Sequence, residues 1–422
     1  MDSRGPGMIS RLKSLRGRRA VAAILVTAVT LLLIGGVILT TTTIGCGPAQ
    51  TLGLKGLATR CSFSPTAVVL TTPSPLAKGT PPDFPYTPPP PFTPPPSAPV
   101  PVVISDSGPA SGAYPPFVDS ATSGNPVAEA MSCRLPVYVG PAGSGGFIVY
   151  PGGSYVADPR SSVTIPTPSP GSPSPPPPQY GYPGFGTGLS YDRAYSRWVP
   201  VSYFYVSPDG SHYAHTSTDS VYVENVATGA TTEFGQGHAW TMIGVQNQGV
   251  YATINGAAGL WLLPYSGTPK QITTTGYWQL ANAVAAYGTT ASAVPEGVAN
   301  TIVRLDLTNG AVSDWFTRGG GRSEVIGFDA SGNAVITVSY FTGGAFDVWV
   351  TKGLQDRTPI FGNSQGLGLN GRPIADSHGI WFAMWFSPQQ GGASTAGIAL
   401  YVAGSGLYWM SSLGTQLGGA CV

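Results

Sequence analysis

A pattern of short apolar strands and glycine turns recurs along the second half of the sequence. Five units align at 202–234, 238–275, 277–317, 322–362 and 371–422, and their strands are separated by Gly, Asn-Gly or Asp-Gly turns. Such a series of strands predicts an all-β domain, and a repeat of about 40 to 47 residues is typical of a four-stranded propeller blade. The glycines of the first turn in each unit are Gly210, Gly249, Gly288, Gly332 and Gly379.

A sixth unit fits residues 134–201, although its spacing is interrupted. Its strands read RLPVYVG, GFIVYPGG and SYDRAYSRWVPV, and a proline-rich insert at 164–187 would loop out between them. We therefore expect a six-bladed β-propeller over 131–422, with five or seven blades as the neighbouring possibilities.

The turn residues resemble those of TolB-type, WD-repeat-like propellers with PD40-like repeats. In that family a Ser-Pro-Asp-Gly turn joins the first two strands of a blade, and an Asp-x-x-Thr/Asn-Gly turn joins the last two. Ser207–Gly210 reproduces the first turn, Asn225–Gly229 and Asp306–Gly310 match the second, and Phe328–Gly332 is a degenerate copy of the first. The resemblance covers about 200–362. It implies the fold and little about activity, because such propellers do many things.

Four cysteines are present, Cys46, Cys61, Cys133 and Cys421. A propeller must tie its first blade to its last, so a closed ring would bring Cys133 and Cys421 together. We predict a disulfide between these two residues, and Cys46 and Cys61 would then pair locally or bridge two chains.

The N-terminal region has the pattern of a membrane anchor. Residues 1–19 are basic, and the run Ala20–Leu39 has no charge and twenty residues, which matches the ~30 Å hydrocarbon core. The positive-inside bias predicts a single transmembrane helix at 20–41, a cytoplasmic N-terminus and an extracytoplasmic remainder in the cell membrane. A cleaved signal peptide and a lipoprotein processed at Cys46 are the alternatives.

Proline dominates the segment that follows. Residues 42–130 include FPYTPPPPFTPPPSAPVPV, which cannot form a helix and predicts an extended polyproline II linker. Such a stalk would hold the distal domain away from the membrane. A docking site for proline-binding domains is the alternative.

Residues that carry catalysis are scarce. His212 and His215 lie three apart on an expected strand and point to opposite faces, so they cannot share a metal. No zinc-protease, nucleophile-elbow or phosphate-loop motif occurs in a suitable context. We expect no catalytic residue, no metal and no cofactor, and the net charge of +1 does not favour nucleic acid.

Candidate ligand-binding residues lie where the innermost strands should begin, near the central opening. Aromatic rings beside a few hydrogen-bonding groups suit carbohydrate or peptide. The alternative, which the residues favour, is that the tryptophans pack between blades, as large aromatic side chains often do. The candidates are His238, Trp240, Tyr277, Trp278, Gln279, Arg322, Glu324 and Arg372.

The leading functional hypothesis is a membrane-anchored, extracytoplasmic binding or scaffolding module of the cell envelope, without catalysis. Its partners would be the membrane and a cell-wall glycan, a peptide or an envelope protein. The alternatives are a propeller-type lyase or hydrolase acting on an envelope glycan or peptide, and a structural wall-spacer protein.

Overall fold

The computed structural model describes ten stretches of the chain. The expected transmembrane segment, Cys46, Cys61, most of the expected linker and the insert at 164–187 lie outside them. Contacts divide the chain into two units, Met1–Thr72 and Pro73–Val422, and every described residue belongs to the second. None of the helices in the described stretches has the length and apolar character needed to cross a membrane. The described stretches are 106–110, 112–119, 125–139, 144–162, 188–216, 220–234, 238–292, 300–341, 343–387 and 393–422.

Three blades in the middle of the chain are complete four-stranded antiparallel meanders. They begin within a residue or two of the repeat units expected at 238–275, 277–317 and 322–362. Their strands are β10 (Trp240–Gln246), β11 (Gly249–Ile254), β12 (Leu260–Pro264) and β13 (Lys270–Thr273); β14 (Tyr277–Ala281), β15 (Ala285–Thr289), β16 (Asn300–Asp306) and β17 (Val312–Arg318); and β18 (Gly321–Phe328), β19 (Ala334–Tyr340), β20 (Phe346–Thr351) and β21 (Arg357–Gly362).

Two further blades flank this set. One contains β7 (His212–Thr216), β8 (Val221–Asn225) and β9 (Thr231–Phe234), with Val206 bridged to Tyr213 in the inner position. The other contains β22 (Leu367–Leu369), β23 (Ile374–Asp376), β24 (Gly379–Phe386), β25 (Thr395–Val402) and β26 (Gly406–Ser411). Short 3-10 helices lie nearby at η4 (Tyr203–Tyr205) and η5 (Asn363–Gln365).

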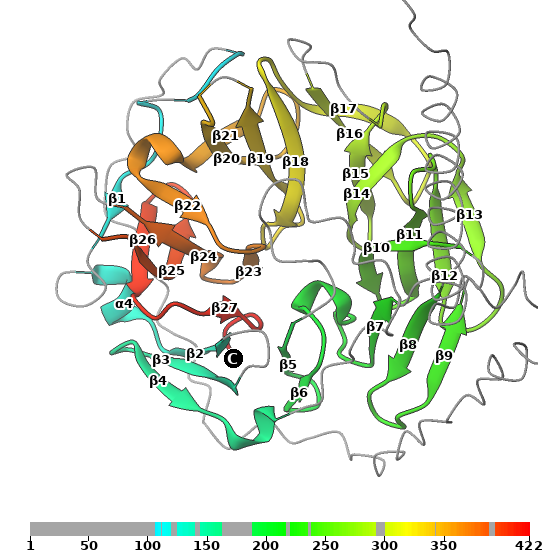
Figure 1. Cartoon of the computed structure of the whole chain (residues 1–422), viewed down its shortest axis with the longest axis horizontal. Helices are drawn as coiled ribbons and strands as arrows, with labels where there is room; N and C mark the ends of the chain where they lie inside the picture. Colours follow the sequence, from blue (N-terminus) through cyan, green and yellow to red (C-terminus); the bar gives the residue numbers. More distant parts are fainter. Residues whose placement is uncertain are drawn as a thin grey trace, which may run out of the picture. The chain divides into compact units, whose positions relative to one another are not determined.

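The sixth blade joins the two ends of the domain. Its sheet order is β27-β2-β3-β4, so its first strand comes from the C-terminal region and the others from the start of the domain. The described residues thus form a six-bladed β-propeller, as the repeats predict (Figure 1). The strands are β2 (Cys133–Val139), β3 (Ser144–Tyr150), β4 (Ser154–Ala157) and β27 (Gln416–Leu417), and η3 (Pro159–Ser161) follows β4.

One part of the expected sixth unit folds differently. The segment SYDRAYSRWVPV does not complete the blade but forms a separate hairpin, β5 (Ser190–Asp192) and β6 (Arg197–Val199). The hairpin packs its Tyr191 and Trp198 against Phe147 of the blade. The blade does not need this segment, because β27 already supplies its fourth strand.

Backbone pairing and a disulfide close the ring. Val137 pairs with Leu417, and the backbone groups of Arg134 and Val422 exchange two hydrogen bonds of 3.0 Å. The predicted disulfide between Cys133 and Cys421 is present and joins residues 288 apart in sequence. We call these contacts between β2 and residues 416–422, together with the disulfide, the ring closure.

Part of the segment expected to be linker lies on the ring. β1 (Phe117–Val118) pairs in parallel with β26, and the Phe117 ring packs edge-on against Phe386 at 5.4 Å. The short helix α4 (Pro126–Ala130) is capped by the buried Asn125, and its Val127 joins the core of the closing blade. The described residues between 106 and 130 therefore belong to the propeller, because this stretch supplies apolar side chains that the blades bury.

A buried polar network fixes the start of this segment. Arg318 and Asp347 are both 0% exposed. The Arg318 Nε donates to the Tyr340 hydroxyl at 2.6 Å, and that hydroxyl donates to Asp347 Oδ2 at 2.8 Å. Asp347 also accepts the Ala110 backbone N–H at 2.8 Å and the Tyr114 hydroxyl. The network therefore links β17, β19 and β20 to Ala110 and Tyr114.

Candidate functional site

A pocket of about 380 Å³ opens near the centre of the ring, which is within the size range of ligand sites. It lies at the ends of innermost strands, where β10 finishes at Gln246 and β18 at Phe328. The hairpin β5–β6, the helix η4 and the turn at Ser207–Gly210 supply the rest of the wall together with β23. Several blades therefore contribute to one cavity.

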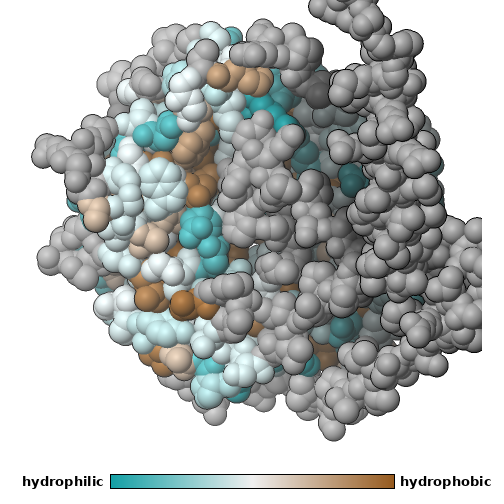
Figure 2. All heavy atoms as spheres, in the orientation of Figure 1, coloured by the Kyte–Doolittle hydropathy of each residue, from teal (hydrophilic) through white to brown (hydrophobic). Residues whose placement is uncertain are grey.

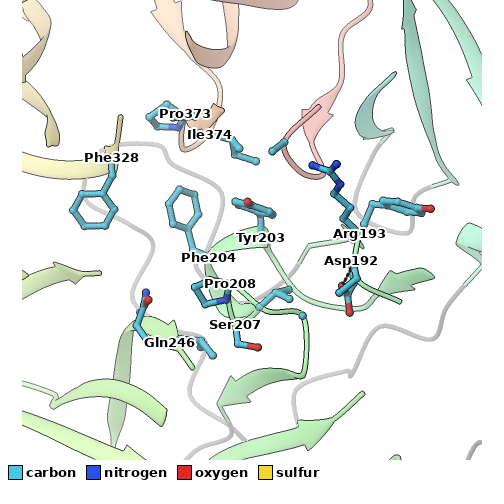
Figure 3. A pocket seen from close by; sticks show the side chains of 18 of the residues that line it. Asp192, Arg193, Tyr203, Phe204, Ser207, Pro208, Gln246, Phe328, Pro373 and Ile374 are labelled. Atoms are coloured by element: carbon cyan, nitrogen blue, oxygen red, sulfur yellow. Dashed lines mark hydrogen bonds between the residues drawn. The ribbon is translucent and has the colours of Figure 1, made fainter. Parts of the chain in front are cut away.

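The pocket has an apolar side and a charged side. Figure 3 shows Phe328, Pro373 and Ile374 on one side and Asp192 with Arg193 on the other, with Tyr203 and Phe204 between them. Gln246 and Ser207 add hydrogen-bonding groups to the lower wall in this view. The cavity thus combines aromatic faces with groups of both charges.

Asp192 is the most perturbed acid of the pocket. Its side chain is 3% exposed, and Oδ1 accepts the backbone N–H groups of Ala194 at 2.9 Å and Tyr195 at 3.4 Å. Burial raises the pKa of Asp192 to about 6, and the nearby Asp209 adds to the rise while Arg197 opposes it. A carboxyl group in this state can exchange a proton near neutral pH.

Asp192 leaves no room for a side chain at the glycine of the Ser-Pro-Asp-Gly turn. Gly210 has φ of +71°, and a Cβ at this position would meet Asp192 Oδ1 at 2.3 Å. Hydrogen bonds hold the turn, because Asp209 Oδ1 accepts from the Ser207 hydroxyl at 2.7 Å and from the Ser211 backbone N–H at 3.0 Å. The motif therefore shapes the pocket wall as well as the turn.

Replacing Asp192 with asparagine is expected to stabilise the protein at neutral pH and not at pH 4. Because the pKa of Asp192 is higher in the folded protein than in the unfolded chain, folding favours the protonated acid. The stabilisation that the protonated acid provides is present at low pH and is lost as pH rises from about 4 to about 6. Asparagine cannot ionise, so Asp192→Asn avoids this loss and should raise the free energy of unfolding by about 1–2 kcal/mol at pH 7.5. Thermal unfolding of both proteins across this range measures the difference, and an equal gain at both pH values would contradict the assignment.

None of the eight residues proposed from the sequence lines this pocket. Most of them lie near the beginnings of the innermost strands, whereas the pocket lies at the ends. Trp240 is buried between the rings of His238 and Trp261, at centroid distances of 5.6 and 5.9 Å. Trp278 is also buried, and its Nε1 donates to the Thr275 carbonyl at 2.9 Å.

One of the remaining candidates connects two blades. Gln279 Oε1 accepts the Val325 backbone N–H at 2.9 Å, which ties β14 to β18. Burial raises the pKa of Glu324, and the positive charges of Arg372 and Arg322 oppose this rise. Tyr277 is half-buried at the first position of β14.

Arg372 lies beside the pocket without lining it. Its guanidinium lies 5.3 Å from the centroid of the Phe204 ring, and Phe204 lines the cavity. Pro373, the next residue, also lines it. Arg372 therefore contacts an aromatic ring of the pocket wall.

Sequence reasoning missed Asp192, Arg193, Phe204 and Phe328 as pocket residues. The available signal was the Ser-Pro-Asp-Gly turn, since this motif follows the inner strand and marks the end where the pocket opens. The hairpin at β5–β6 gave no such signal, because it lies outside the repeat.

Hydrophilic and hydrophobic residues are mixed over the coloured part of the face that Figure 2 shows. Pale and teal residues are interspersed with smaller brown groups over the part of this face that is coloured. This mixture agrees with a sequence in which only 9% of residues are charged.

Comparison with known proteins gives a likeness to solved propellers only. No protein-family profile matches the sequence, and no curated protein matches it. A putative TolB from Agrobacterium tumefaciens is 16% identical with a TM-score of 0.36, and covers 50% of this chain and 81% of its own. An oligogalacturonate lyase in complex with manganese is 14% identical with a TM-score of 0.34, and covers 48% of this chain and 63% of its own. At this level neither likeness bears on the activity of this chain.

Proposed function

We propose that this protein is a binding module of the cell envelope, and that its ring binds a peptide-bearing glycan fragment in the central pocket. The segment at 20–41 would anchor it in the membrane, and the proline-rich linker would hold the ring outside the cell. No catalysis is required for this role.

The pocket is the observation that carries the proposal. The rings of Tyr203, Phe204 and Phe328 offer apolar faces of the kind that pack on sugar rings and apolar side chains. Asp192 adds a carboxyl group and Arg193 adds a guanidinium cation at one side of the pocket. A ligand with amine, carboxylate and hydroxyl groups would match this combination better than a purely apolar or a strongly charged molecule.

A second candidate is an enzyme that cleaves such a fragment. Asp192 and Asp329 both line the pocket, and burial raises the pKa of Asp192 to about 6, a value suited to proton transfer. In this case mass spectrometry would detect cleaved fragment, and Asp192→Asn would abolish cleavage while leaving binding in place. The binding proposal predicts that the fragment is recovered intact.

The binding proposal is tested by the thermal unfolding of the full-length protein in detergent, followed by tryptophan fluorescence. The probes are a muropeptide (a wall disaccharide with its stem peptide), the disaccharide alone and the stem peptide alone. We expect the muropeptide to raise the melting temperature saturably, since ligand at 100 times its Kd stabilises by about 2.7 kcal/mol. A larger effect of one separate part identifies which half of the fragment binds.

Two variants locate the effect. Phe328→Ala removes a half-buried ring from the pocket wall and should weaken muropeptide binding about tenfold or more. Val312→Ala removes apolar atoms at a position that is 55% exposed on β17, and this matched control should bind as the unmodified protein does. The proposal fails if no probe changes the melting temperature, or if both variants bind equally well.

A further inference from the structure

Three side chains with metal-binding chemistry meet at the ring closure. Cys133 begins β2, Cys421 lies beyond β27, and His378 lies in the turn between β23 and β24. Two Sγ atoms and one imidazole nitrogen lie within 4.8 Å of one another. The residues come from three separate segments, so this group exists only when the ring is closed.

A carboxylate holds the histidine in place. His378 Nδ1 lies 3.1 Å from Asp376 Oδ1, and the His378 backbone N–H donates to the same oxygen at 2.8 Å. Asp376 Oδ2 accepts the Trp381 Nε1–H at 2.8 Å and the Cys421 backbone N–H at 2.9 Å. One carboxylate therefore fixes both the imidazole and the backbone of a cysteine. Ligating histidines commonly have such a partner on the nitrogen that does not bind metal.

The other nitrogen of this imidazole is enclosed. His378 Nε2 has no hydrogen-bond partner within the described residues, and the side chain is 13% exposed. Leaving a buried polar atom without a partner costs free energy. A cation bound to the Nε2 lone pair would remove this cost. The Cα atoms of Cys133 and Cys421 are 5.7 Å apart, which leaves the two thiolates close enough to share one ion after reduction.

We propose that Cys133, Cys421 and His378 bind one divalent ion of the zinc class when the disulfide is reduced. Two thiolates and an imidazole are a donor set that selects such an ion, and water would occupy the fourth position. Asp376 is a positioning residue that orients the imidazole. The ring closure then has two forms, a covalent one under oxidising conditions and a metal-bound one under reducing conditions.

Conversion between the disulfide form and the metal-bound form conserves electrons and protons. A dithiol reductant gives two electrons and two protons to the Cys133–Cys421 bond and becomes a disulfide itself, which leaves two protein thiols. Each thiol releases its proton when the ion binds. In the reverse step a small-molecule disulfide accepts two electrons from the two thiolates and, with two protons from solvent, becomes two thiols, which restores the Cys133–Cys421 bond and releases the ion.

Cobalt(II) tests this site by its absorption spectrum. The full-length protein carries Cys46→Ser and Cys61→Ser, so that Cys133 and Cys421 are its only thiols. It is reduced without oxygen by a trialkylphosphine, which takes the oxygen of water and becomes a phosphine oxide. We expect a thiolate-to-cobalt charge-transfer band and tetrahedral d–d bands that saturate at one ion per chain, and zinc should abolish both.

Variants assign the ligands. His378→Ala should weaken cobalt binding about 10–100-fold and change the d–d bands, and Asp376→Asn should weaken it by about tenfold. His212→Ala removes a half-buried imidazole elsewhere in the propeller and should leave the titration unchanged. Near-ultraviolet circular dichroism establishes that each variant is folded. The proposal is overturned if the reduced protein gives no charge-transfer band at one equivalent of cobalt, or if His378→Ala leaves affinity and spectrum unchanged.

Discussion

Replacing both Cys133 and Cys421 with alanine is expected to lower the free energy of unfolding by about 4–5 kcal/mol. The disulfide joins residues 288 apart, so it closes nearly the whole domain in the unfolded chain. Its loss raises the entropy of that state, and the backbone pairing of β27 with β2 then closes the ring alone. Thermal unfolding should show a midpoint lower by roughly 10 °C.

Two controls separate this effect from damage to the fold. The unmodified protein, reduced in the presence of a chelator, should unfold at nearly the same midpoint as the double variant. Peptide mapping without reduction should recover a peptide that contains Cys133 and Cys421. Equal midpoints for the oxidised protein and the double variant, or a peptide linking Cys61 to Cys133, would refute this account of the ring closure.

The second large effect is expected at the buried network that holds residues 110–114. Asp347→Ala should destabilise the protein by about 3–5 kcal/mol, because removing one partner leaves buried polar groups uncompensated. The Ala110 N–H and the Tyr114 and Tyr340 hydroxyls lose their acceptor. Burial raises the pKa of both tyrosines, so the two hydroxyls stay protonated and cannot replace the carboxylate.

Urea unfolding and hydrogen exchange measure this effect. Exchange of residues 106–110 and 112–118 should become faster in Asp347→Ala, since the carboxylate no longer holds them on the ring. Asp314→Ala changes an exposed acid on β17 and should alter stability by less than about 0.5 kcal/mol. A loss below 1 kcal/mol in Asp347→Ala, with unchanged exchange, would show that the network does not anchor this segment.

The repeat predicted most of the fold because turn chemistry is local. The glycine turns and the Asn and Asp side chains mark strand ends without reference to the rest of the chain. Asn225 and Asp306 accept backbone N–H groups within their own turns. The cysteine pairing followed from ring closure alone. The strand β27 was not assigned to the first blade, because pairing between the two ends of a domain leaves no periodic signal.

The pocket was harder to predict because it depends on parts outside the repeat. Asp192 reaches the ring centre on the hairpin β5–β6, which was assigned to a blade. The direction of the inner strands also matters, since the candidates were placed at their beginnings and the pocket lies at their ends. Sequence periodicity locates the strands but does not show on which face of the propeller a pocket opens.

Hydrogen–deuterium exchange of the full-length protein, with and without the muropeptide, tests the central claim most directly. If the ligand binds in the central pocket, exchange should slow at 191–195, 203–208, 244–246 and 328–329. Protection confined to 238–240, 277–279 and 322–324 would place the ligand at the other ends of the strands and contradict the claim, as would unchanged exchange at saturating muropeptide.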